Sequence, residues 1–240
     1  MGISLCAVAK AFNIKTVIFM PKTMSIERQK LLRMYGAELV LTEDFKEAFE
    51  RAEVYAKEHN AFLSHQFENL SNIKAHLQTA KEIEKQIKGN VNYFIAGMGT
   101  SGTLMGVGGY FKQKFGTKVI GVEPYCSQIF SSGKSLGHHK IQGLSDDIIP
   151  KLYNKDIVDD LIQVTDEDAL AMADKLAKTF GFGVGISSGA NFIGCVISGV
   201  NNVVSVFSDD NKKYISTELS TCFSTKLVNN IKLIGFDVIK

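Results

Sequence analysis

The segment GMGTSGT, residues 97–103, places three glycines and three hydroxyl side chains between an apolar run, VNYFIA, and a segment that can start a helix. Glycines let the backbone turn tightly, and the amides at a helix start attract an anion. The hydroxyls of Thr100, Ser101 and Thr103 suit a compact phosphate monoester better than a pyrophosphate, whose charge is spread over two groups. This glycine loop therefore predicts a phosphate-bearing ligand, with a ligand-free helix entry as the alternative.

The same glycines also match a second class of ligand. Gly97, Gly99 and Gly102 have the spacing G-x-G-x-x-G, and Glu123 ends the next apolar run. In dinucleotide-binding proteins this spacing holds the pyrophosphate, and a carboxylate about twenty residues on binds the ribose. NAD is therefore an alternative ligand.

A second segment, GISSGA at residues 185–190, again puts two hydroxyls and two glycines at a helix start. Ser187 or Ser188 can simply be an N-cap. Open α/β sheets, however, bind ligands outside the carboxyl ends of their strands. Two such loops in one chain favour a ligand that they share.

The composition is that of an ordinary globular protein. Of the 240 residues, 45% are hydrophobic and 22% charged, with a net charge of +2 and no concentrated basic segment. We therefore expect small-molecule partners rather than nucleic acid or a membrane surface. No apolar run reaches the roughly 18 residues of a membrane span, and no signal-peptide pattern opens the chain, so we expect a cytoplasmic protein.

The cysteines indicate neither disulfides nor a metal site. Cys6, Cys126, Cys195 and Cys222 show no C-x-x-C pairing and no histidine at metal-ligand spacing. Reduced thiols in or near the core, with no zinc, are the expectation.

Short β-branched runs alternate with stretches of helical spacing, the pattern of βαβ units around a parallel sheet. Strands are predicted at residues 16–20, 37–42, 61–66, 91–98, 118–124 and 202–208. Helices are predicted at residues 25–36, 47–59, 73–88 and 166–181, and after each glycine-rich loop. The pattern divides into two α/β lobes that meet near residues 70–90.

Six ordered segments together resemble the cysteine synthase family, which includes O-acetylserine sulfhydrylase and cystathionine β-synthase. They are MPKTMSIERQKLLRMYGAELVLT (20–42), HQFEN (65–69), IAGMGTSGTLMGV (95–107), HKIQGLSDDIIP (139–150), GVGISSGAN (183–191) and VFSDDNKKYIST (206–217). The resemblance covers most of the chain. It implies a pyridoxal 5′-phosphate (PLP) enzyme that replaces the β-substituent of a serine derivative, such as O-acetylserine, with sulfide to give cysteine.

The resemblance also implies roles for individual residues. Ser187 matches the serine that hydrogen-bonds the pyridine nitrogen, while Gln66 and Gly143 match substrate-binding positions. The residues that match the family's phosphate cradle are Gly99, Thr100, Ser101, Gly102 and Thr103. We expect His76 to be structural rather than catalytic.

The implied fold is the tryptophan synthase β-like PLP fold type II, an α/β fold of two three-layer αβα lobes with mostly parallel sheets. Residues 1–75 would form a smaller, substrate-side lobe, residues 76–220 the larger PLP-binding lobe, and residues 221–240 a tail of uncertain role. Family enzymes are commonly dimers, so a homodimer is expected.

Two departures from the family pattern affect the expected activity. Met1 and Gly2 match the end of the motif S-G-N-T-G, so the family's Schiff-base lysine has no counterpart here. We expect a chain that is incomplete at its N terminus and weak or inactive as a catalyst. A non-catalytic binding or assembly partner is the alternative from another class.

The second departure follows Gly143, where Asp146 and Asp147 replace small residues. Carboxylates there can orient or deprotonate a water or a thiol. An intact relative would then favour a cysteine lyase reaction that releases H₂S, or thiol exchange giving lanthionine. A merely structural role in a surface loop is the alternative.

Overall fold

The computed structural model describes residues 1–87, 89–145, 148–221 and 223–235; Asp146 and Asp147 lie outside these ranges. The chain forms two compact units. The first comprises Met1–Gln66 and Lys212–Ser220, and the second comprises Phe67–Asn211 and Thr221–Lys240.

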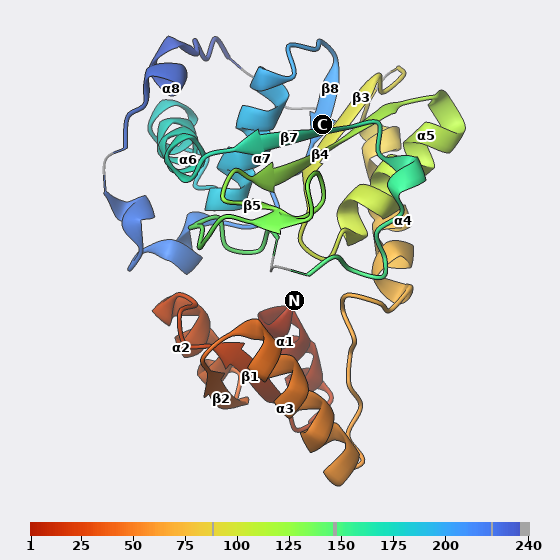
Figure 1. Ribbon diagram of the computed structural model, residues 1–240, viewed down its shortest axis with the longest axis vertical. Coiled ribbons are helices and arrows are strands. Elements are labelled where there is room, and N and C mark those ends of the chain that lie inside the picture. Colours follow the sequence, from red (N-terminus) through yellow and green to blue (C-terminus); the bar gives the residue numbers. More distant parts are fainter. Residues whose placement is uncertain (88, 146–147, 222, 236–240) are drawn as a thin grey trace. The chain divides into compact units, whose positions relative to one another are not determined.

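The first unit is built on two parallel strands, β1 (Val17–Pro21) and β2 (Glu38–Thr42), paired in register from Val17↔Glu38 to Pro21↔Thr42. Its helices are α1 (Gly2–Ala11), α2 (Ile26–Met34) and α3 (Phe45–Glu58), followed later by the 3-10 turns η3 (Asn211–Tyr214) and η4 (Glu218–Ser220). Side chains alternate between the two faces of a strand, so the apolar residues of β1 and β2 lie on both faces of this small sheet. Helices cover both faces (Figure 1).

One face of the small sheet packs against α1 and α2, where buried Cys6 and Leu32 meet Ile18 and Leu39. On the other face, the ring of Phe19 in β1 lies 5.8 Å from that of Tyr55 in α3. This arrangement gives the first unit an αβα layering.

Residues 212–220 join the first unit through specific contacts with α2 and its start. Ser25 Oγ donates to the carbonyl of Lys213 (2.6 Å), and the Arg28 guanidinium donates to the Tyr214 hydroxyl (2.5 Å). The buried Tyr214 ring is also stacked under Arg28, whose Cζ lies 4.9 Å from the ring centre. A segment distant in sequence thus completes the unit.

The second unit contains a parallel sheet in the order β7-β4-β3-β8. The strands are β3 (Tyr93–Gly97), β4 (Lys118–Pro124), β7 (Asp160–Val164) and β8 (Val203–Ser205). The helices are α4 (Ser71–Gln86), the π-helix η1 (Leu104–Gly108), α5 (Gly109–Phe115), α6 (Asp166–Phe180), α7 (Ile186–Ile197) and α8 (Lys226–Asn230). Smaller elements are β5 (Ser127–Gln128), β6 (Lys134–Ser135) and the 3-10 turn η2 (Lys155–Ile157).

Helices cover both faces of this sheet as well (Figure 1). On one face, the buried Phe94 and Val119 pack with residues of η1 and α5, including Phe111. On the other face α7 crosses β3 and β4, and Gly194 comes so close that an added Cβ would lie 2.6 Å from Val122. The predicted three-layer αβα class is confirmed.

Two strand predictions differ from the structure. Residues 61–66 contain no strand, and Phe62 is 85% exposed. An apolar run becomes a strand only where another strand pairs with its backbone, and none of the described strands pairs with this run. Conversely, β7 was not predicted from the sequence, although it pairs with β4 at the edge of the larger sheet.

The segment after residue 220 packs against α6. Thr225 Oγ1 donates to Asp168 Oδ1 (2.5 Å), and Lys175 Nζ donates to the carbonyls of Val228 (2.7 Å) and Ile231 (2.5 Å). Val228 is buried. The described part of the tail thus belongs to the core of the second unit.

The described cysteines Cys6, Cys126 and Cys195 are free thiols. Burial raises the pKa of the Cys195 thiol to about 11, so this thiol is protonated at neutral pH. Within the described ranges, no group of three or more His, Cys, Asp or Glu side chains is placed to hold a metal ion. No helix in those ranges has the length and apolar character needed to cross a membrane.

The contact between α6 and α7 depends on Gly189, where an added Cβ would lie 2.1 Å from the Ala169 carbonyl oxygen. We expect Gly189→Ala to lower the free energy of unfolding by about 1–3 kcal/mol through overpacking. Gly109→Ala is the matched control, since its Cβ would meet only Ile157 at 3.4 Å. Urea denaturation measures both, and equal midpoints for Gly189→Ala and the parent would refute the close contact.

Candidate active site

The glycine loop lies at the carboxyl end of β3, an inner strand of the parallel sheet, and leads directly into η1. Met98 N still donates to the Val122 carbonyl (3.0 Å), so the loop begins in register with the sheet. The chain then turns at Ser101, whose φ of +65° is in the left-handed region. This is the edge where open α/β sheets bind ligands.

Two glycines of the loop lie in close contact with residues 143–144. An added Cβ on Gly99 would lie 2.2 Å from the Gly143 carbonyl oxygen, and one on Gly97 would lie 2.5 Å from Leu144. Ser145 N donates to the Met98 carbonyl (2.8 Å). The structure therefore brings the predicted Gly143 against the predicted Gly99.

Ser145 anchors the segment that carries Gly143. Its hydroxyl is buried and lies 2.7 Å from Ser127 Oγ, and its carbonyl lies 3.1 Å from His139 Nε2. Upstream in the same segment, Lys140 N donates to Asp166 Oδ2 (2.8 Å). Burial raises the pKa of the Asp166 carboxyl above its ordinary value.

The three hydroxyls of the glycine loop differ in their surroundings. Thr100 Oγ1 accepts from Gly102 N (3.3 Å) and from Asn72 Nδ2 (3.0 Å), and Thr103 Oγ1 lies 3.2 Å from His76 Nε2. Ser101 is only 2% exposed, yet its Oγ has no hydrogen-bond partner in the part of the chain that the structure describes. A buried hydroxyl without a partner is unfavourable unless a ligand supplies one. The loop residues therefore fit a phosphate group.

The two serines of the second loop, residues 185–190, have different surroundings. The N-cap of α7 is Gly185, so the N-cap interpretation of the serines is wrong. Ser188 is completely buried, and its Oγ accepts from Ser208 N (3.2 Å). Ser187 is 7% exposed, and no side-chain hydrogen bond to it is present within the described residues. Ser187 is therefore the serine that can reach a ligand.

Asn191 is a site residue that sequence analysis missed. Its Oδ1 accepts from Gly97 N (2.7 Å), and its Nδ2 donates to the Val206 carbonyl (2.8 Å). The β3–β8 pairing ends at Ile95↔Ser205, so the Asn191 amide connects the two segments just beyond the last paired residues. An amide inside the apolar segment ISSGANFIGCVI was the available signal.

Glu123 does not serve as a ribose-binding carboxylate. It is completely buried at the end of β4, and it accepts from Phe130 N (3.1 Å) and from Gln163 Nε2 (3.0 Å). These bonds use the carboxylate to fix the following loop. The NAD interpretation is therefore wrong.

Gln66 belongs to the first unit, whereas the other described candidates belong to the second. Asp146 and Asp147 lie outside the described residues, so their predicted role stays a prediction. No lysine is buried among the described residues. Those of the second unit that are half-buried, Lys112 and Lys175, bond to Asp159 and to carbonyls of the tail.

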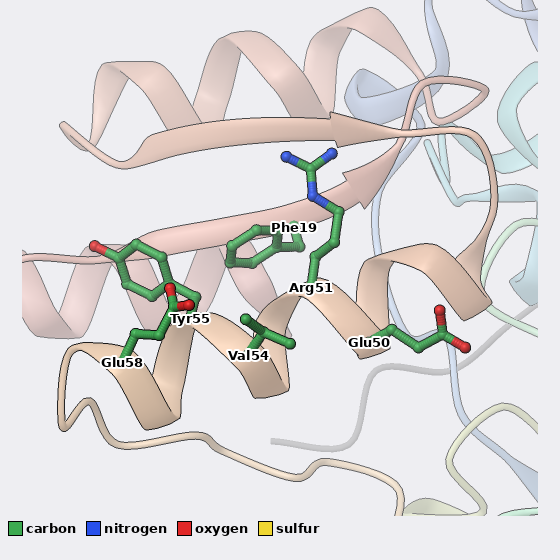
Figure 2. Close-up of a pocket in the computed structure, with 6 residues that line it drawn as sticks. All are labelled: Phe19, Glu50, Arg51, Val54, Tyr55 and Glu58. Carbon is green, nitrogen blue, oxygen red and sulfur yellow. The ribbon is translucent and has the colours of Figure 1, made fainter.

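A separate groove of about 310 Å³ lies on the first unit. Figure 2 shows its lining, which comprises Phe19, Glu50, Arg51, Val54, Tyr55 and Glu58. The Arg51 guanidinium pairs with Glu47 (3.1 Å) and lies 5.9 Å from the Phe19 ring. No residue predicted for the site lines this groove, and we assign no ligand to it.

The fold and the glycine loop are features that can be compared with those of known protein families. A family model described as pyridoxal-phosphate dependent enzyme matches residues 1–209. The chain belongs to this family, and its fold is PLP fold type II.

Within the family the chain is cysteine synthase-like. Cysteine synthase B of Campylobacter jejuni is 39% identical over 228 residues, which cover 91% of this chain and 76% of that relative. A cysteine synthase of Staphylococcus aureus is 39% identical over 229 residues, covering 91% and 74% of the two chains. The predicted family and the predicted PLP dependence are confirmed.

Solved structures agree with this placement. A hydrogen sulfide-producing enzyme from Fusobacterium nucleatum superposes with a TM-score of 0.88 at 39% identity, covering 94% of this chain and 72% of that chain. A mutant of that enzyme complexed with an α-aminoacrylate intermediate gives 0.92 at 38% identity, covering 100% and 76%. A cysteine synthase from Entamoeba histolytica gives 0.86 at 33% identity, covering 96% and 74%.

The Asn191 amide predicts a measurable stability effect. Asn191→Ala leaves the Gly97 amide and the Val206 carbonyl without their partner, and unpaired buried groups cost about 1–3 kcal/mol. We expect the free energy of unfolding in urea to fall by this amount. Asn229→Ala, which removes an exposed amide bonded to Ser224, is the control and should change it by less than about 0.5 kcal/mol. Equal stabilities of the two variants would contradict the assigned bridge.

Proposed function

We propose that the second unit holds the phosphate of PLP at Gly99, Thr100, Ser101, Gly102 and Thr103, and that Ser187 hydrogen-bonds the pyridine nitrogen. The observation that carries this assignment is the buried Ser101 hydroxyl, which has no hydrogen-bond partner among the described residues. The amides that precede η1 and the close-packed glycines give an anion access to the backbone.

When bound, PLP supplies the electron sink for reactions at the β-carbon of an amino acid. The residues of the chain bind and orient. The Ser187 hydroxyl is neutral, so it can hydrogen-bond the pyridine nitrogen without giving up a proton to it. We assign Gln66 and Gly143 to the amino-acid substrate, by their resemblance to family positions.

We propose β-replacement as the reaction class, in which O-acetylserine and sulfide give cysteine. The cysteine synthases among the relatives support this choice. Cysteine lyase activity with release of H₂S, or thiol exchange giving lanthionine, is the second candidate. It is favoured by the structural similarity to hydrogen sulfide-producing enzymes and by Asp146 and Asp147 after Ser145.

We further propose that this 240-residue chain binds PLP without a covalent bond and turns over slowly. The absence of buried lysines among its described residues supports this proposal. A non-catalytic binding or assembly role is the corresponding alternative. We also propose that the protein is a homodimer and lies in the cytoplasm.

The Ser101 hydroxyl allows stability and binding to be separated. Ser101→Ala removes an unpaired buried hydroxyl, so the free energy of unfolding should stay constant or rise by about 1 kcal/mol. Affinity for PLP, measured by fluorescence titration, should fall about tenfold, the equivalent of one hydrogen bond.

The matched ligand for this experiment is pyridoxal, which lacks the phosphate. Ser101→Ala should leave its affinity unchanged, whereas Ser187→Ala should weaken PLP and pyridoxal alike. The exposed Ser224→Ala variant is the control for substitution itself. Unchanged PLP affinity in Ser101→Ala would remove the phosphate assignment.

Activity is tested with the 240-residue chain in excess PLP. We expect cysteine formation from O-acetylserine and sulfide to be far slower than with the Campylobacter jejuni enzyme assayed in parallel. Release of sulfide from cysteine, measured on the same sample, separates the two reaction classes. Sulfide release that exceeds cysteine formation would favour the lyase, and a rate equal to that of the relative would overturn the proposed impairment.

A further inference from the structure

Helix α4 presents two polar side chains, one turn apart, to the glycine loop. Asn72 Nδ2 donates to Thr100 Oγ1 (3.0 Å), and His76 Nε2 lies 3.2 Å from Thr103 Oγ1. Residues four apart lie on the same face of a helix. One helix face therefore contacts both threonine hydroxyls of the loop.

Two glycines with the same spacing make these contacts possible. An added Cβ on Gly102 would lie 2.0 Å from Asn72 Oδ1, and one on Gly106 would lie 2.5 Å from His76 Cβ and 2.8 Å from the Ile73 carbonyl. Gly106 lies in η1, a π-helix, and such turns are frequent at functional sites. The loop and η1 thus fit closely against this particular pair of side chains.

The acceptor capacity of Thr100 is already used inside the protein. A hydroxyl has one donor and two acceptor positions. Thr100 Oγ1 accepts from both Gly102 N and Asn72 Nδ2, so its own proton is left for an outside acceptor. Asn72 in this way makes Thr100 a hydrogen-bond donor toward the ligand.

The same argument assigns the tautomer of His76. Burial lowers the pKa of its imidazole, so the ring is neutral at neutral pH and carries one N–H. Nδ1 is buried and has no partner in the described part of the chain. An unpaired buried N–H is rarer than an unpaired acceptor, so the proton belongs on Nε2, which then donates to Thr103.

We propose that Asn72 and His76 are positioning residues: Asn72 donates a hydrogen bond to the Thr100 hydroxyl and His76 donates one to the Thr103 hydroxyl, and these bonds direct both hydroxyl protons toward the phosphate of the cofactor. The inference rests on the proposed assignment of the glycine loop to that phosphate. It adds an element, α4, to the site and gives His76 a role beyond packing.

The test compares PLP with pyridoxal in position-matched variants. Asn72→Asp keeps the shape but replaces the donor amide by an acceptor, and His76→Leu removes the Nε2 donor. Each should weaken PLP about tenfold and leave pyridoxal unchanged, since one hydrogen bond to the phosphate is misdirected. His76→Gln restores a donor at the Nε2 position and should recover most of the affinity. Equal losses for both ligands, or no recovery in His76→Gln, would indicate a merely structural role and overturn the proposal.

Double mutants show whether each residue acts through its threonine. In a Thr103→Val background, His76→Leu should cause no further loss of PLP affinity, and Asn72→Asp should behave likewise with Thr100→Val. Additive losses would overturn the proposal.

The histidine tautomer gives a readout that needs neither cofactor nor mutation. In ¹⁵N NMR of the parent chain, the His76 ring should carry its proton on Nε2; a proton on Nδ1 would overturn the proposal. If the parent binds no PLP, the proposed function fails, and this spectrum alone decides whether α4 orients Thr103.

Discussion

The site depends on how closely the backbone of the glycine loop and of η1 approaches neighbouring parts of the second unit. At four positions an added Cβ would come within 2.5 Å of another atom, so no other residue type fits without displacement. These positions are Gly97, Gly99, Gly102 and Gly106. Their neighbours come from two parts of the second unit, residues 143–144 and helix α4. The loop conformation is therefore a property of the whole unit, in which each neighbour restricts one part of the turn.

The parallel sheet contributes the third restriction. A strand pair that ends leaves backbone groups without partners, and these groups need replacement where they are buried. Asn191 supplies both a donor and an acceptor just beyond the last β3–β8 pair, so the first amide of the loop is held by α7. The same helix carries Ser187 one turn earlier. One helix thus fixes the start of the loop and carries Ser187, so the contact proposed between this serine and the cofactor ring would couple fold stability to binding.

Sequence patterns predicted the elements that their own residues determine. The apolar runs of β3 and β4, the helical spacing of α6 and the glycine loop were all expected, because local propensity and periodicity specify them. A local sequence pattern does not specify which strands pair with each other. Residues 61–66 and the β7 segment illustrate this, since the first was expected as a strand and the second was not. The roles of Ser188 and Asn191 depend on Ser208, Gly97 and Val206, which are distant along the chain.

The glycine spacing alone left two ligand classes open, and the surroundings of each polar group separate them. A dinucleotide site needs an available carboxylate at the end of the next strand, but the one on β4 bonds internally to Phe130 and Gln163. A phosphate site needs donors. Asn72 and Gly102 occupy the acceptor positions of Thr100, so its hydroxyl can act toward a ligand only by donation. The donor and acceptor roles in the existing hydrogen bonds therefore favour a phosphate over a dinucleotide. Residue type and glycine spacing alone do not distinguish these two ligand classes.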